Sequence, residues 1–172
     1  ANPRDPDALR TAVRAATLAG DHGLAARALE ALASADPTNT VILTELAGVY
    51  RASGNRPALI RTLEREIALK PGSAALAGEL AEIFLEDGVN DRAGEYAKKG
   101  LALSPGDGRF HIIMGEVFRA KGLNGQALAE YRKALADTRW EESARKLIPL
   151  VEPETSETRK KEQEFFQRGK KP

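Results

Sequence analysis

The sequence predicts an all-α solenoid, in which antiparallel helix pairs follow one another along the chain. Two regular spacings indicate this fold. Four glycines recur at a constant interval, at Gly20, Gly54, Gly88 and Gly122. Four prolines keep the same interval and precede the glycines by half of it, at Pro3, Pro37, Pro71 and Pro105. The interval of about 34 residues is typical of a repeat that consists of two helices.

Apolar residues between these markers have the spacing of one helical face. Leu43, Leu46 and Tyr50 stand at i, i+3 and i+7, and the same spacing starts again at Ala77 and His111. The predicted first helices cover residues 7–19, 41–53, 75–87 and 109–121. The predicted second helices cover residues 23–35, 57–69, 91–103 and 125–136.

Three kinds of residue mark the ends of these helices. Glycine adopts the left-handed backbone that ends a first helix, and proline cannot continue a second helix because it lacks the N–H group. Capping residues recur at one point of each repeat, at Asp5, Asn39, Ser73 and Asp107. Small residues are expected where paired helices approach closely, at Ala25, Ala93, Gly100, Ala127 and Ala134.

The repeat resembles the tetratricopeptide repeat, whose motif combines Leu with Gly or Ala, an aromatic residue, a turn glycine, and later Ala, an aromatic residue, Ala and Pro. The fourth copy carries six of these features, at Gly115, Phe118, Gly122, Ala127, Tyr131 and Ala134. The first copy is rich in alanine and lacks aromatic residues. The resemblance covers about residues 3–138 and implies a right-handed superhelical solenoid.

The expected organisation is an array over residues 1–138, a capping helix over 139–150 and a charged tail or helix over 151–172. The four repeats are expected at about 6–39, 40–73, 74–107 and 108–138. Arg139 replaces the next proline, and a helix after Trp140 would cover the apolar side of the last pair. Because Ala1–Pro3 matches the end of a repeat, further repeats or domains are expected upstream.

Composition favours a protein partner over other kinds of ligand. The 172 residues carry a formal net charge of +1, which gives no strong attraction to nucleic acid or anionic membrane. No apolar run approaches the roughly 20 residues of a membrane helix. Cysteine is absent and the two histidines lie in different repeats, so no catalytic residue, metal site or cofactor is predicted. We expect a soluble protein of the cytoplasm or periplasm, and not an enzyme.

The resemblance also implies that the first helices line a concave groove that binds a peptide or a partner domain. The positions expected to face it are filled by Arg10, Arg14, Thr44, Gly48, Arg51, Gly78, Glu82, Glu86, Arg109, Glu116 and Arg119. The first half of this set is basic, the second half is largely acidic, and small residues lie between them. Opposite charges at the two ends could orient a bound peptide. The alternative is that these charges pair with one another on a solvated surface.

The leading hypothesis is a protein-interaction scaffold, with a bacterial assembly for envelope, secretion or polysaccharide export as its setting. An alternative hypothesis is the regulatory or substrate-docking region of a larger enzyme whose catalytic part lies outside this segment. A chaperone adaptor that grips a terminal carboxylate through Lys and Asn is disfavoured, because none of the groove positions holds either residue.

Overall fold

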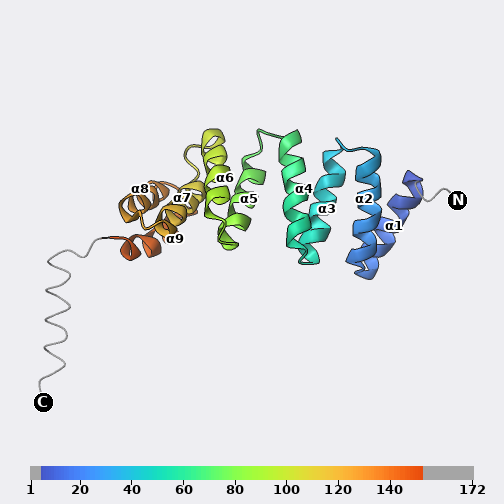
Figure 1. The fold of residues 1–172 in the computed structure, drawn as a ribbon, viewed down its shortest axis with the longest axis horizontal. Helices are drawn as coiled ribbons and strands as arrows, with labels where there is room; N and C mark the ends of the chain where they lie inside the picture. Colours follow the sequence, from blue (N-terminus) through green and yellow to red (C-terminus); the bar gives the residue numbers. More distant parts are fainter. Residues whose placement is uncertain (1–4, 153–172) are drawn as a thin grey trace, which may run out of the picture. The chain divides into compact units, whose positions relative to one another are not determined.

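The computed structural model describes residues 5–152, which form helices and turns only. The helices are α1 (Pro6–Ala19), α2 (His22–Ala35), α3 (Thr40–Ala52), α4 (Arg56–Leu69), α5 (Ala74–Glu86), α6 (Asn90–Leu103), α7 (Gly108–Ala120), α8 (Asn124–Ala134), α9 (Glu141–Leu147) and the 3₁₀ helix η1 (Ile148–Leu150) (Figure 1). Every first helix begins and ends within one residue of its predicted bounds. The predicted all-α class is confirmed. Pro3 and the expected tail beyond residue 152 lie outside the described residues.

The chain divides into two compact units, one up to Pro105 and the other from Gly106 onward. In the first unit, each of the helices α1 to α6 packs against the next one along the chain. In the second unit, α7 packs against α8, and α9 packs against both. Each unit is therefore built from paired helices that are neighbours in sequence.

Each helix pair turns at a glycine in the left-handed region. The φ angles are +70° at Gly20, +69° at Gly54, +71° at Gly88 and +73° at Gly122. The residue after each glycine donates a hydrogen bond to the carbonyl oxygen five residues earlier, as in Asn55 N to Tyr50 O at 2.9 Å and Val89 N to Phe84 O at 2.8 Å. These bonds satisfy carbonyl groups that the end of the helix would otherwise leave open. The turn role predicted for the four glycines is confirmed.

Side chains cap the start of each first helix. The predicted residues all accept hydrogen bonds from backbone N–H groups of the helix that follows, namely Asp5, Asn39, Ser73 and Asp107. Asp21 and Asn55 cap α2 and α4 in the same way. The equivalent residues before α6 and α8 are Val89 and Leu123, which have no capping side chain. The first two repeats therefore stabilise their second helices by a contact that the last two lack.

Where the two helices of a pair cross, a small residue on one helix can face a large residue on the other. Gly115 of α7 lies under the ring of Tyr131 of α8, and a Cβ atom there would overlap Tyr131 Cε1. The equivalent positions of the second repeat hold Ala47 and Leu63, which are also buried. In these two repeats, the one with the larger residue on the first helix has the smaller residue on the second, as close packing favours.

Tyrosine hydroxyl groups bind glutamates of neighbouring helices. Tyr50 donates to Glu30 of α2, and Tyr131 donates to Glu116 Oε1 of α7 at 2.6 Å. Burial, with the hydrogen bond to Glu30 as a second cause, raises the pKa of Tyr50 to about 12. Burial and the bond to Glu116 raise the pKa of Tyr131 as well. Both hydroxyl groups therefore stay protonated and act as donors that tie helix pairs together.

The second unit ends in a different connection from the earlier repeats. Helix α8 ends at Ala134, two residues before the predicted end at 136. Arg139 stands where a proline follows each of the earlier second helices. Instead, Asp137 Oδ2 accepts a hydrogen bond from Gly108 N at 3.0 Å, which brings the segment after α8 against the start of α7. Ala144 of α9 and Val151 then complete the apolar core around Tyr131.

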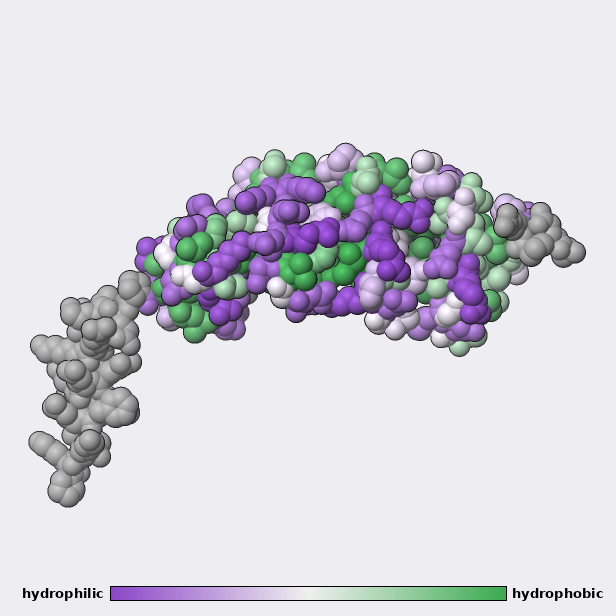
Figure 2. All heavy atoms as spheres, in the orientation of Figure 1, coloured by the Kyte–Doolittle hydropathy of each residue, from purple (hydrophilic) through white to green (hydrophobic). Residues whose placement is uncertain are grey.

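Exposed hydrophobic residues are scattered over the surface. Figure 2 shows hydrophilic side chains across the visible face, with hydrophobic ones in separate small patches. Among the described helices, none combines the length and the apolar composition that crossing a membrane requires.

Changing Gly88 to valine should destabilise the first unit through its backbone alone. No atom lies within 4 Å of a Cβ atom built at this position, so the effect comes from forcing a β-branched residue into the left-handed region. We expect a loss of about 1–2 kcal/mol in the free energy of unfolding and a melting temperature lower by several degrees. Gly72→Val is the matched control, because Gly72 has equal space and no left-handed φ. Equal melting temperatures for the two variants would contradict the turn assignment.

Changing Gly115 to alanine should destabilise the second unit by overpacking, by about 1–3 kcal/mol. The reason is the contact with Tyr131, so replacing that ring should relieve the strain. The double variant Gly115→Ala with Tyr131→Leu reproduces the pair found in the second repeat. Denaturant unfolding of both single variants and the double variant measures the coupling. Additive losses would show that the two residues do not constrain each other.

Candidate partner-binding face

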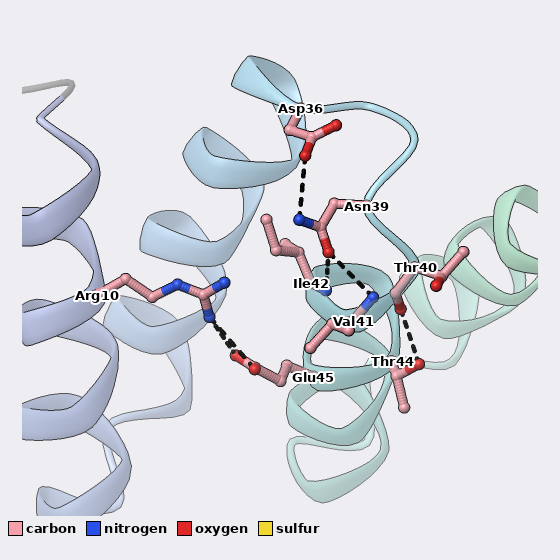
Figure 3. A network of polar contacts seen from close by, with 8 residues as sticks. All are labelled: Arg10, Asp36, Asn39, Thr40, Val41, Ile42, Thr44 and Glu45. Carbon is pink, nitrogen blue, oxygen red and sulfur yellow. Dashed lines mark hydrogen bonds and ion pairs between the residues drawn. The ribbon is translucent and has the colours of Figure 1, made fainter.

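Ion pairs join successive first helices of the first unit. Arg10 of α1 reaches Glu45 of α3, with Nη1 at 3.1 Å from Oε2, and Figure 3 shows the two side chains pointing toward each other. Arg51 of α3 pairs in the same way with Glu79 of α5. The helices α1, α3 and α5 therefore lie side by side, and we call the surface that they form the first-helix face. In the same view, Asn39 caps the start of α3.

The two partner glutamates were not among the predicted site residues. Glu45 and Glu79 occupy the same position of consecutive repeats. This repetition of an acidic residue beside the predicted arginines is the signal that could have identified them. Arg10 and Arg51 thus each pair with a glutamate that lies outside the predicted set.

The acidic end of α5 is also paired. Glu86 Oε2 lies 2.8 Å from Arg56 Nη2 of α4, and Arg56 Nε lies 2.7 Å from Asp87 Oδ1. The same guanidinium donates to the carbonyl oxygen of Ile83 at 2.9 Å. Hydrogen bonds to Glu86 and Asp87 raise the pKa of Arg56. Glu86 therefore contributes to the contact between α4 and α5.

Other predicted residues of this unit make contacts within it or lie buried or half-buried, although Thr44 itself is exposed. Thr44 donates a hydrogen bond to Glu66 Oε1 at 2.5 Å, which helps to satisfy a carboxylate on α4 that is only 4% exposed. Lys70 donates to the same oxygen at 3.2 Å. Gly78 is buried within α5, and Glu82 is half-buried. Thr44 and Gly78 thus serve packing and polar satisfaction within the unit.

In the second unit, Glu116 binds Arg119 and Tyr131 together. Arg119 Nη2 lies 2.5 Å from Glu116 Oε2. Burial alone would raise the pKa of Glu116, but the hydrogen bonds from Arg119 and Tyr131 hold it below its usual value. Arg109 is half-buried at the start of α7, where its N–H donates to the cap residue Asp107.

Arg14 differs from these arginines. It is exposed on α1, one helical turn after Arg10, and it forms no ion pair within residues 5–152. Between α1, α2 and α3 the surface is hollowed by about 370 Å³. The hollow is lined by Val13, Thr17, His22, Leu29, Glu45, Gly48, Val49 and Ala52. Arg14 does not line the hollow, but it directly follows the lining residue Val13 in α1, and the predicted residue Gly48 lines the hollow from α3.

Residues that could support metal chemistry are not grouped in the described part of the chain. No cluster of three or more His, Asp or Glu side chains there could hold a metal ion. His111 is buried, and its Nδ1 lies 2.7 Å from Glu130 Oε2. Burial would raise the pKa of Glu130, but hydrogen bonds from Lys133 and His111 keep it lowered.

Comparisons with known proteins agree with this architecture. A family model for the tetratricopeptide repeat matches residues 42–75. A search of curated protein sequences finds no significant match.

Several solved structures share the fold. A crystal structure of MamA protein is similar with a TM-score of 0.71 at 21% identity, over 85% of this chain and 80% of that one. MamA from Desulfovibrio magneticus RS-1, residue 41 to its end, has a TM-score of 0.67 at 14% identity, over 85% and 82% of the two chains. The thermophilic TPR protein TTC0263 of Thermus thermophilus has a TM-score of 0.54 at 22% identity, over 87% and 82%.

These solved structures share the helix-pair solenoid with the chain, and the matching family model falls on its second repeat. The left-handed glycine turns recur once in every repeat of the described structure. The comparisons therefore identify a tetratricopeptide repeat at residues 42–75 and show that the chain shares the fold of these solved structures.

Proposed function

We propose that this chain is a scaffold for protein interactions that binds a peptide or a partner domain on its first-helix face. The repeat type supports a scaffold, because stacked helix pairs create extended surfaces for binding other proteins. The main reason for choosing this face is Arg14. It is the predicted arginine of the first unit that forms no ion pair with a described residue, and it is next in the chain to Val13, which lines the hollow.

The distribution of charge refines the earlier expectation. Arg10 and Arg51 are each paired with a glutamate, so the proposed attraction for an anionic partner centres on α1 and not on a basic half of the array. Exposed ion pairs contribute only about 0–1 kcal/mol each, so Arg10 can exchange Glu45 for a carboxylate of a partner at small cost. Arg10 and Arg14 together form the basic end of the proposed site.

The proposed partner is a protein or a peptide, not a nucleic acid. A bacterial assembly for envelope, secretion or polysaccharide export is the cellular setting that we predict for it. Neither the partner nor the setting needs a resident cofactor.

Reversing both arginines, as Arg10→Glu with Arg14→Glu, should weaken binding of the partner by about tenfold or more, because like charges then oppose each other at the site. Partners are first identified by affinity capture and mass spectrometry with the unmodified chain. Their recovery by the variant is then compared under equal salt conditions.

The matched control reverses Arg61 and Arg65 of α4. These residues are also four positions apart and exposed, they make no ion pair among the described residues, and their reversal changes the net charge equally. The proposal expects the control to recover the partner normally. Equal loss with both variants would point to a general effect of charge and would refute a site on the first-helix face.

A further inference from the structure

We infer that the hollow beside Gly48 is a pocket for one apolar side chain of the partner, and that Arg14 binds a carboxylate close to that side chain in the partner's sequence. This inference rests on the proposed function and names the chemistry of the segment that is bound. Two independent features carry it: a glycine that the fold does not need, and an arginine that the fold leaves unpaired.

Gly48 has no structural role that explains its identity. It lies in the middle of α3, where glycine destabilises a helix relative to alanine. Its backbone does not require glycine, because the left-handed φ angles occur at the turn positions. A Cβ atom at Gly48 would meet nothing within 4 Å, whereas one at Gly115 would overlap the ring of Tyr131. The missing side chain therefore leaves open space at the surface and fills no packing need in the described residues.

The position of Gly48 in the repeat makes this space unusual. The equivalent residues of the other first helices are Arg14, Glu82 and Glu116, all of which have long side chains. Only the second repeat has no side chain at this position, and the hollow lies at this point of the surface. Arg14 holds the same repeat position on α1 as Gly48 on α3, and it is next in the chain to Val13, which lines the hollow. We therefore expect a segment that inserts a side chain at Gly48 to come within reach of Arg14.

The lining of the hollow selects an apolar group. Val13, Leu29, Val49 and Ala52 contribute hydrocarbon, and Leu18 beside Thr17 is 89% exposed. A volume of about 370 Å³ is at the small end of the usual range for ligand pockets, which suits a single large side chain with some of its backbone. Burial of apolar surface from both partners would favour the complex.

The charges near the hollow favour an acidic residue in the bound segment. Glu45 lines the hollow and is already paired with Arg10 at 3.1 Å, whereas Arg14, next to the lining residue Val13 in the chain, forms no ion pair among the described residues. An arginine can bind a carboxylate through two parallel hydrogen bonds, which adds direction to the attraction. The segment that fits is therefore a peptide with an apolar residue next to, or within one helical turn of, Asp or Glu.

The test is a selection of random dodecapeptides displayed on phage, with the unmodified chain immobilised. Recovered peptides are synthesised with a fluorescent label, and their dissociation constants are measured by anisotropy. We expect an apolar residue near an acidic one in the recovered sequences. Gly48→Leu fills the hollow and should weaken their binding about tenfold without lowering the melting temperature. Gly125→Leu is the matched control, since a Cβ atom at Gly125 also meets nothing within 4 Å, and it should bind normally.

The charge is tested by a double-mutant cycle. Replacing the acidic residue of the peptide by Gln should weaken binding to the unmodified chain and have little further effect on the Arg14→Gln variant. If peptides bind Gly48→Leu normally but lose binding to the Arg10→Glu, Arg14→Glu variant, the pocket is refuted while the first-helix face stands. If no peptide is recovered, the pocket is refuted. If peptides bind both Gly48→Leu and the Arg10→Glu, Arg14→Glu variant as tightly as the unmodified chain, the pocket and the proposed function are both refuted.

Discussion

The hydrogen bond that follows each turn glycine, from the next residue back to the carbonyl oxygen five positions earlier, closes every helix pair in the same way. It requires a left-handed residue, which glycine supplies without strain. Because the turn is the same each time, the second helix returns along the first at a constant register. Equivalent positions of successive repeats then face similar surroundings. The ion pairs between first helices, the matched crossing residues and the hollow at Gly48 all depend on this repetition.

Local features of the fold were predictable because they depend on the chain close to them. The turn glycines, the caps at Asn39 and Ser73 and the bounds of the first helices follow from backbone preference and short-range hydrogen bonds. The early end of α8 was not predictable, because it depends on the contact between Asp137 and Gly108 after the chain has turned back. The ion-pair partners of the arginines were not predicted, for a similar reason. Whether Arg10 reaches Glu45 depends on the distance between neighbouring helices, which spacing alone does not give.

The glycines show that one residue type can have different roles, which the sequence alone does not distinguish. At Gly88 it provides a backbone conformation, at Gly115 it makes room for Tyr131, and at Gly48 it leaves a space that nothing in the described chain fills. The sequence alone shows three glycines in helical repeats. Only the surroundings of each separate a structural need from open space at the surface, and that difference directs the proposed site to α1 and α3.

Amide chemical-shift mapping tests the central claim most directly, namely that a partner segment binds between α1 and α3. The isotopically labelled chain is titrated with a bound peptide, and the shifted amides are placed on the structure. The account predicts the largest shifts at Val13 and Thr17 of α1 and at Gly48 and Val49 of α3, which line the hollow. Shifts confined to α4 or to the second unit would contradict it.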